Sequence, residues 1–281
     1  RGRIGADPGY PNPFQIGEPV SSQAVGRVIE SRSKHFVPGD IVSHVLGWRD
    51  MAIVPGRQAR KITSGLPEEL YLGIMGGSGL TGYFGITEVA GVKAGDVVFV
   101  SGAAGCVGST VVQLAKQAGA TVIGSAGGPQ KLDWLREIGC DEVIDYRATS
   151  NLEEALAACA PDGIDVYFDN VGGDHFFAAL ASAKMHARFA ECGMIADYNN
   201  GYQTVPRNLM LIVAKRVRIE GFSGYDYFDR INEFYATMEP MLRDGRLKNR
   251  QTVVEGIENA VDALRGLFDG KNIGKMLVKI R

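Results

Sequence analysis

The chain has 281 residues, of which 45% are hydrophobic and 22% charged, so it can bury a sizeable core in one large or two ordinary domains. Its 30 Lys and Arg against 32 Asp and Glu leave a net charge of −2, too balanced for an electrostatic footprint on nucleic acid or an anionic membrane. No apolar run approaches the roughly 18 residues of a membrane span. The four dispersed cysteines fit a reducing, cytoplasmic compartment. We therefore expect neither a nucleic acid nor a membrane as a partner.

The first 73 residues or so predict a mainly β domain. Two runs, 26–30 and 40–45, carry β-branched residues between Gly, Pro and Ser, which is typical of strands in a partly antiparallel sheet. The closing run 275–280 is also strand-like and could return to that sheet.

From residue 97 the pattern changes to strands alternating with helices. Val97 to Val100 is wholly apolar, and after a glycine-rich turn the apolar residues recur at helical spacing. Further strands are expected at 121–123, 142–144, 164–168, 187–192 and 217–221, and helices at 130–138, 152–159, 227–243 and 259–268. Short apolar strands alternating with helices predict an α/β fold, a doubly wound parallel sheet covered on both faces.

The run 217–221 differs from the other predicted strands. Its charged residues alternate with Val217 and Ile219, which indicates an edge strand with one wet face. Because an edge strand can pair with a second copy of itself, we expect a homodimer.

The segment after the first apolar strand contains Ala103-x-Gly105-x-x-Gly108, with Ala in the first glycine position of the dinucleotide fingerprint. Gly105 would allow the backbone to approach a pyrophosphate, and Gly108 would allow helix and strand to pack closely. The helix N-terminus would supply free N–H groups and the positive end of its dipole. A purely structural turn is the alternative interpretation, but the strand before the turn and the βα series after it favour a nucleotide.

The end of the second strand indicates which dinucleotide is preferred. An NAD site usually has an acidic residue about 20 residues after the glycine turn, whereas the run 121–131 has none. Lys131 stands where a 2′-phosphate would lie, and Tyr146 and Arg147 end the next strand. Cationic and hydroxyl donors suit a dianionic phosphate, so we expect NADP(H). The missing acid also weighs against a methyltransferase that binds S-adenosylmethionine.

Several longer motifs identify a family. The runs Gly79-Leu-Thr-Gly-Tyr-Phe-Gly85, Phe168-Asp-Asn-Val-Gly-Gly173 and Cys192-Gly-Met-Ile-Ala-Asp-Tyr-Asn199 resemble the zinc-free medium-chain dehydrogenase/reductase superfamily. Within it the chain is similar to the branch of leukotriene B4 12-hydroxydehydrogenase, prostaglandin reductase, alkenal double-bond reductase and bacterial curcumin reductases. The resemblance covers essentially the whole chain. It implies a Rossmann NADP(H)-binding domain at 74–245 and a GroES-like, mainly β substrate domain at 1–73 and 246–281. The start at Arg1 looks like the middle of that substrate domain, so we expect the domain to be truncated here.

The resemblance also implies where the cofactor binds. The implied contacts are Gly105, Cys106, Val107 and Gly108 at the pyrophosphate, Lys131 and Tyr146 at the 2′-phosphate, Asn170, Cys192, Gly193, Ile195 and Tyr198 along the groove, Phe222, Ser223 and Gly224 in a loop over the nicotinamide, and Asn272 near the C-terminus.

The implied activity is reduction of the C=C bond of α,β-unsaturated ketones or aldehydes, with a small hydrophobic substrate. A quinone oxidoreductase of the same superfamily and a nicotinamide-binding protein without turnover are the alternatives. Enolate stabilisation needs a hydrogen-bond donor, and the resemblance assigns that role to Tyr198, although water could supply the proton. Tyr10, Trp48 and Tyr83 are the candidates for lining a substrate pocket. The zinc-binding His-Glu pair is replaced by Gly17-Glu18-Pro19 and no four-cysteine lobe is present, so we expect no metal.

Overall fold

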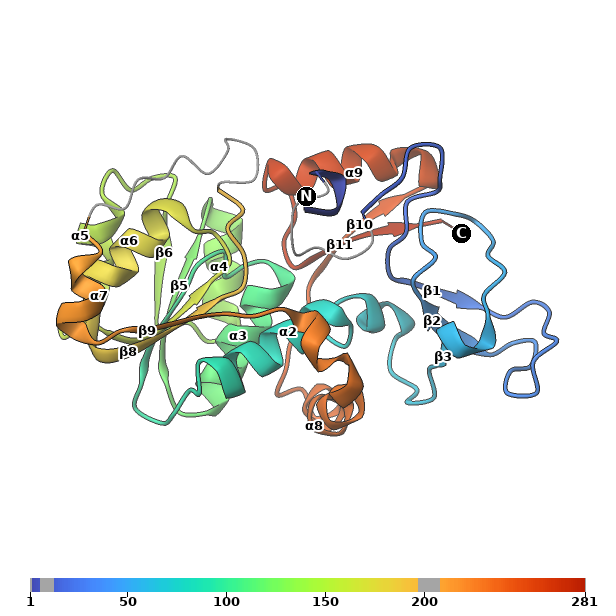
Figure 1. Ribbon diagram of the computed structural model, residues 1–281, viewed down its shortest axis with the longest axis horizontal. Coiled ribbons are helices and arrows are strands. Elements are labelled where there is room, and N and C mark those ends of the chain that lie inside the picture. The colour runs from blue at the N-terminus through green and yellow to red at the C-terminus, as the bar shows by residue number, and fades with distance from the viewer. Residues whose placement is uncertain (1, 6–12, 197–207, 281) are drawn as a thin grey trace. The chain divides into compact units, whose positions relative to one another are not determined.

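The computed structural model describes residues 2–5, 13–196 and 208–280. The chain forms two compact units, one of residues Arg1–Gly76 with Gln251–Arg281 and the other of Gly77–Arg250. Figure 1 labels the elements of both. No helix of the described segments has the length and apolar character needed to cross a membrane.

The unit Gly77–Arg250 is built on a six-stranded parallel sheet (Figure 1), which confirms the predicted α/β architecture. Its strands are β4 (Val97–Val100), β5 (Thr121–Ala126), β6 (Glu142–Asp145), β7 (Ile164–Asp169), β8 (Ala183–Glu191) and β9 (Arg218–Gly221), in the order β6-β5-β4-β7-β8-β9. The chain builds outward from β4 to β6 on one side and from β7 to β9 on the other. The strand order therefore reverses between β4 and β7.

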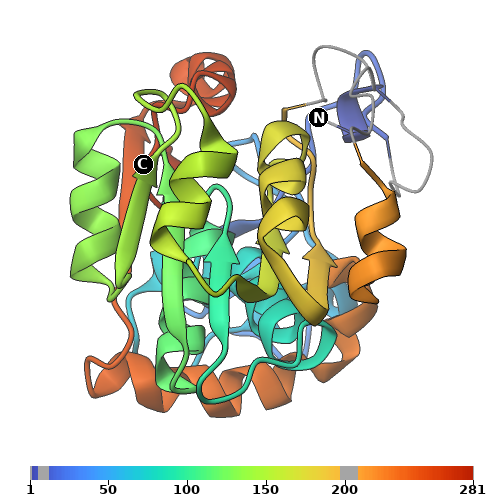
Figure 2. The same ribbon diagram turned by 90° about the vertical axis from the view of Figure 1, so that its left-hand side faces the viewer.

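Helices cover both faces of this sheet. The helices of this unit are α2 (Gly77–Phe84), continued by a π-helical turn (Gly85–Val89), α3 (Cys106–Gln117), α4 (Pro129–Glu137), α5 (Leu152–Cys159), α6 (Gly173–Ser182), α7 (Met210–Lys215) and α8 (Ile231–Arg243). Of these, α2 packs on α3, and α8 packs on α2. The helices α5, α6 and α7 cover the face that carries Phe99 and Tyr167, and they lie in front of the sheet in Figure 2. The opposite face includes Gly124, which packs against Leu135 of α4.

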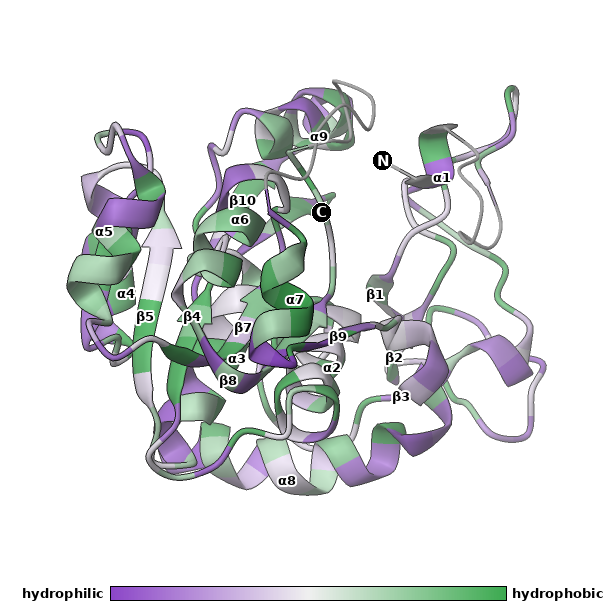
Figure 3. Cartoon of the chain, turned by 60° about the vertical axis from the view of Figure 1, so that its left-hand side comes forward, coloured by the Kyte–Doolittle hydropathy of each residue, from purple (hydrophilic) through white to green (hydrophobic). Residues whose placement is uncertain are grey.

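The core of this unit is aromatic and aliphatic. The ring of Phe99 stacks on Tyr167 at 5.3 Å between centroids, and Phe189 meets Tyr167 edge-on at 5.2 Å. All three side chains are at most 1% exposed. In Figure 3 the inner strand β4 is green along its length, whereas β9 is interrupted by purple. The charged and apolar residues of β9 alternate between exposed and more buried positions, as expected for an edge strand.

The unit of Arg1–Gly76 and Gln251–Arg281 contains two small sheets. The strands β1 (Ala24–Arg27), β2 (Ile41–His44) and β3 (Arg60–Lys61) form an antiparallel sheet, as predicted. The closing strand β11 (Lys275–Lys279) does not join it but pairs in parallel with β10 (Gln251–Glu255), a strand that the sequence pattern did not indicate. The helices here are α1 (Gly2–Gly5) and α9 (Ala260–Phe268), and Gly270, with φ +66°, follows the Asp269 C-cap of α9.

Two predicted elements differ by three or more residues at their N-terminal ends. The helix expected from 227 begins as a 3-10 segment (Gly224–Arg230) before α8, because Ser223 caps the Tyr225 N–H and the ring of Tyr227 stacks on Phe84 at 4.5 Å. The strand β8 begins at Ala183 rather than 187. Between the buried Ala183 and Ala187 lie Lys184, Met185 and His186, which are partly or fully exposed, so this stretch lacks the apolar pattern that predicts a buried strand.

Candidate functional site

The carboxyl ends of β4 and β7 form the place where a doubly wound sheet binds its ligand. The two strands are neighbours, and the connections after them leave toward opposite faces of the sheet. Gly102, after β4, lies against Asn170, after β7, so that a Cβ at position 102 would be 3.3 Å from the Asn170 Cβ. The sequence motifs on either side of this edge therefore meet at the strand-order reversal.

The turn after β4 contains three glycines, and the structure explains each of them in a different way. Gly102 has φ +57°, so this residue, rather than position 103, makes the tight turn. A Cβ at Gly108 would lie 2.6 Å from the Ala103 Cα, which explains the close packing of α3 on β4. A Cβ at Gly105 would meet only the Gly102 carbonyl oxygen, at 3.4 Å. Since nothing in the described chain requires glycine at 105, the open space there fits a ligand approaching the backbone.

Gly105 also caps the helix that begins the site. It is the N-cap residue of α3, and its carbonyl accepts the Ser109 N–H at 2.8 Å. The first N–H groups of an α-helix have no partner within the helix and carry the positive end of its dipole. The start of α3 thus provides donors for an anionic group next to the open face of Gly105.

The opposite side of the edge is organised by the carboxylate of Asp169. Its Oδ1 accepts hydrogen bonds from the Ser101 hydroxyl at 2.9 Å and from the N–H groups of Val171 and Gly172 at 2.7 and 2.8 Å. Ser101 in turn accepts the Asn170 N–H at 2.9 Å, and its carbonyl accepts the Asn170 amide at 2.8 Å. Together these bonds fix the turn after β7 against the end of β4.

The segment after β8 follows the same edge. The Asp169 carbonyl accepts the N–H groups of Cys192 and Gly193 at 2.9 and 3.1 Å. The Ala196 N–H donates to the Val171 carbonyl at 3.0 Å. The predicted groove residues Asn170, Cys192, Gly193 and Ile195 are therefore brought to one edge of the sheet. Burial and nearby carboxylates raise the pKa of the Cys192 thiol to about 12, so it stays protonated.

A cationic cluster lies beyond β5 and β6. Lys131 is half-buried, and burial together with the nearby Arg147 guanidinium lowers its pKa. A Cβ at Gly127 would lie 2.8 Å from Arg147 Nε and 3.0 Å from Tyr146 Cζ, so both side chains pack over this glycine. Asp145 accepts the Gly128 and Arg147 N–H groups and holds the two turns together. Two cations and a phenol held close together match the donor set that a phosphate dianion requires.

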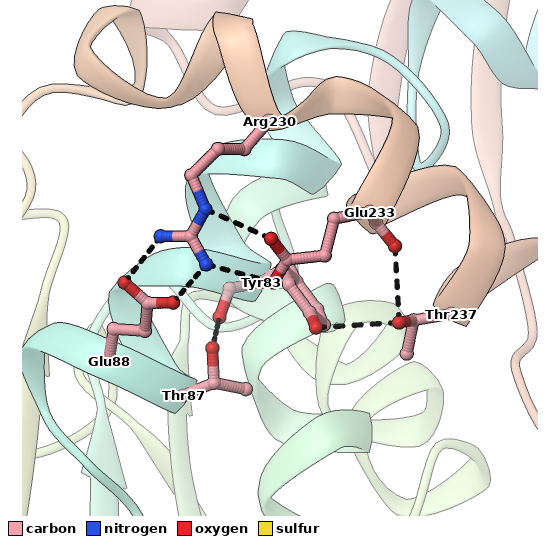
Figure 4. Close-up of polar contacts among 6 residues, drawn as sticks. All are labelled: Tyr83, Thr87, Glu88, Arg230, Glu233 and Thr237. Carbon is pink, nitrogen blue, oxygen red and sulfur yellow. Dashed lines mark hydrogen bonds and ion pairs between the residues drawn. The ribbon is translucent and has the colours of Figure 1, made fainter.

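The segment with Phe222, Ser223 and Gly224 is fixed against α2 and its π-helical extension. The Phe222 ring packs on Gly85 and meets Phe168 at 5.9 Å, and Gly224 lies against Thr81. Arg230 continues this attachment: it donates to both carboxylate oxygens of Glu88, as Figure 4 shows, and binds Glu233 as well. This pairing lowers the pKa of Glu88.

Other predicted residues lie outside this edge or outside the described chain. Tyr83 packs on Phe234 at 5.7 Å and shares a hydrogen bond of 3.4 Å with Thr237, so it contacts α8 (Figure 4). Trp48 and Asn272 belong to the other unit, where the Asn272 amide donates to the Gly274 carbonyl at 2.8 Å. Cys106 and Val107 are partly buried at the start of α3. The predicted catalytic Tyr198 and the pocket candidate Tyr10 lie outside the described residues.

The site contains residues that sequence reasoning missed. They are Ser101 and Asp169, which are buried, and Glu191, which is half-buried with a buried carboxylate; all three lie at strand ends, and only Asp169 lies within a recognised motif. Their signal in the sequence is weak: each is a polar residue closing a run that is otherwise apolar. In residues 2–5, 13–196 and 208–280, no group of three or more His, Cys, Asp or Glu could hold a metal ion.

Comparison with known proteins gives two family matches. Residues 106–243 match the family model described as zinc-binding dehydrogenase, and residues 1–62 match the N-terminal domain of oxidoreductase.

Individual relatives match almost the whole chain. The NADP(+)-dependent 2-alkenal reductase of Nicotiana tabacum is 39% identical over 274 residues, 96% of this chain and 80% of the relative. The NADPH-dependent curcumin reductase of Escherichia coli (strain K12) is 34% identical over 288 residues, 100% of this chain and 83% of the relative. The crystal structure of CurA from Vibrio vulnificus in complex with NADPH superposes with a TM-score of 0.92 at 35% identity, covering 100% of this chain and 85% of that one.

Proposed function

The chain belongs to the medium-chain dehydrogenase/reductase superfamily, in the branch of the alkenal and curcumin reductases, and on this premise we propose that it is an NADPH-dependent C=C reductase. The proposed substrates are small hydrophobic α,β-unsaturated ketones and aldehydes. The observation that carries the proposal is the glycine turn at the strand-order reversal, where Gly105 is open to a ligand and α3 begins. Relatives that cover the same residues are named for this chemistry.

The described residues fit NADP(H) at both ends of a dinucleotide. The turn at 102–108 suits the pyrophosphate, and Lys131, Tyr146 and Arg147 suit the 2′-phosphate. The edge formed by Asn170 and the segment 192–196 continues away from β4, where the nicotinamide half would lie. The cofactor role of Asn272, which belongs to the other unit, stays a prediction from the sequence. In this assignment the unit Gly77–Arg250 binds the cofactor, and the unit with β1–β3 and β10–β11 serves as the substrate domain.

The protein must orient the substrate and stabilise the charge that develops on its carbonyl oxygen. Bound NADPH supplies the hydride for the β-carbon of the substrate. We assign the hydrogen bond to the developing oxyanion to Tyr198, two positions after Ala196 in the sequence. The hydrogen-bonded edge that ends at Ala196 is firmly held, which suits a positioning role.

Substrate-dependent oxidation of NADPH, followed by absorbance, tests the proposed activity. The substrates are a medium-chain 2-alkenal, an aryl enone and a small quinone, each assayed with NADPH and with NADH. We expect turnover of the alkenal and the enone with NADPH, and slower turnover with NADH. Oxidation with the quinone alone would identify a quinone oxidoreductase instead. NADPH binding without any oxidation would indicate a binding protein.

We also propose a cytoplasmic homodimer. No disulfide joins the four cysteines, all of which lie in the described chain, and this suits a reducing compartment. The strand β9 lies at the edge of the six-stranded sheet, where a second copy could extend the ladder. Light scattering on the purified protein at micromolar concentration should give the mass of a dimer, and the mass of a monomer would contradict edge pairing. Cell fractionation tests the compartment.

A further inference from the structure

The ends of β7 and β8 place two carboxyl groups side by side. Asp169 and Glu191 are register partners in the parallel ladder, so their side chains point to the same face of the sheet. Two residues earlier, Tyr167 and Phe189 occupy the same face and form its aromatic core. The helix α6 covers this face.

The two carboxyl groups are buried and incompletely satisfied. Asp169 is 0% exposed, and its Oδ2 has no hydrogen-bond partner within the described chain. Both carboxylate oxygens of Glu191 and the Tyr167 hydroxyl are likewise buried without a partner among the described residues. Two adjacent ionised carboxylates in such a site would repel each other and would also lack solvation. One proton between them removes one charge and supplies a donor to the Asp169 carboxylate.

Among the described residues, the titratable groups beside this pair do not supply a compensating cation. On β7, burial holds the pKa of Tyr167 well above its usual value, so the phenol is neutral. On α6, burial lowers the pKa of His175, which shares a hydrogen bond of 2.9 Å with Ser125. The Asp174 carboxylate, at the start of the same helix, adds negative charge, and the Cys192 thiol is neutral. A shared proton is therefore the compensation that these surroundings provide.

The pair is directly bonded to the turns of the site. Through Oδ1, Asp169 holds the turn after β7, and through its carbonyl it holds Cys192 and Gly193. The carbonyl of Glu191 accepts the Phe222 N–H at 3.3 Å. A change in the charge of the pair thus acts on three segments of the candidate groove.

We propose that Asp169 and Glu191 share one proton and that this pair positions the turns that bind the cofactor, which makes Glu191 a positioning residue for NADPH binding. The inference rests on the proposed cofactor. It predicts that the site binds NADPH more weakly at alkaline pH. Burial and the adjacent Asp169 raise the pKa of Glu191 to about 9. Above that pH a second negative charge develops beneath a site for an anionic ligand.

The pair also makes the unliganded protein sensitive to pH. The folded-state pKa of Glu191 lies above its ordinary value of 4.5, so the folded chain holds a proton that the unfolded chain releases. The associated stability is fully present below pH 4.5 and is lost as the pH rises toward about 9. Replacing Glu191 with Gln keeps a hydrogen-bond donor to Asp169 and removes this titration.

The experiment compares the Kd of NADPH, measured by cofactor fluorescence between pH 7.5 and 10, for the wild type, Glu191→Gln, Glu191→Leu and Glu142→Gln. The last is the control, because Glu142 is an exposed residue of β6. Titration of Lys131 affects every variant, so the measured quantity is the ratio of the wild-type Kd to that of Glu191→Gln. We expect this ratio to rise about tenfold over the range. Glu142→Gln should follow the wild type, and Glu191→Leu should bind more weakly at every pH because Asp169 loses the donor that the shared proton provides.

A constant ratio would overturn the inference. Thermal unfolding without cofactor tests the pair separately. Between pH 7.5 and 10, the Tm of the wild type should fall by more than the Tm of Glu191→Gln. Equal losses would contradict the shared proton. Failure of the wild type to bind NADPH at any pH would overturn the proposed function and the positioning role together. Normal binding with equal pH dependence in both proteins would overturn the inference alone.

Discussion

The two sides of the strand-order reversal are built in opposite ways. After β4, the turn at 102–108 depends on three residues without side chains. Gly102 adopts a positive φ, Gly108 allows α3 to pack closely on the turn, and Gly105 leaves its backbone accessible. After β7 and β8, the edge depends on buried polar side chains, above all Asp169, which organises the neighbouring backbone. The first side therefore tolerates no added volume at Gly108, whereas the second tolerates no lost hydrogen-bond acceptor.

The largest effect is expected at Gly108. A Cβ there would lie 2.6 Å from both the Ala103 Cα and the Gly102 carbonyl oxygen, so backbone must move. Gly108→Ala should cost about 3 kcal/mol of unfolding free energy, measured by urea denaturation. Gly105→Ala is the matched control, because its Cβ has an ordinary contact at 3.4 Å. It should leave stability within about 1 kcal/mol but weaken NADPH binding about tenfold. Equal destabilisation by both changes would contradict the different roles of the two glycines.

Removing the acceptor on the second side should have a comparable effect on stability. Asp169→Ala removes the acceptor of three donors, on Ser101, Val171 and Gly172, and should cost about 2–3 kcal/mol in the same denaturation experiment. Asp169→Asn keeps an acceptor oxygen and should cost less. If Asp169→Ala were no worse than Asp169→Asn, the acceptor would not organise this edge.

A smaller effect, on catalysis, is expected for Tyr198→Phe. If the hydroxyl stabilises the developing enolate, kcat should fall by roughly 100-fold while the KM for NADPH changes little. Steady-state kinetics with the alkenal measure both constants, and thermal unfolding checks that the fold is retained. An unchanged kcat would remove Tyr198 from the catalytic role.

The smallest effect is expected at the 2′-phosphate end. Lys131→Ala should raise the KM for NADPH about tenfold, while the KM for NADH stays nearly constant. Arg136→Ala, an exposed position on the same helix, is the control and should alter neither constant. Equal increases in the two KM values would show that Lys131 does not distinguish the phosphate.

Much of the fold could be predicted from local pattern. The strand at Val97–Val100 and the helix at Leu152–Cys159 lie where predicted, since apolar runs and helical spacing are complete within short windows. The strand β10 was missed because its residues are half-exposed and its partner β11 lies beyond α9. The 3-10 start before α8 depends on the stacking of Tyr227 against Phe84, a contact that sequence spacing does not reveal.

The candidate site divides in the same way. The glycine turn and the residues at the predicted 2′-phosphate end follow directly from motifs and from the missing acid after the second strand. The sequence alone thus determined the βα series and the need for glycines in its first turn, because both depend on residues that are close together in the sequence. Only the tertiary structure decided that Gly102 makes the turn and that Asp169 lies beside Glu191. Asp169 and Glu191 become neighbours because β7 pairs in parallel with β8, although helix α6 separates the two strands in the sequence. Because their carboxylate oxygens are buried, the two groups cannot both be ionised without repulsion and lost solvation.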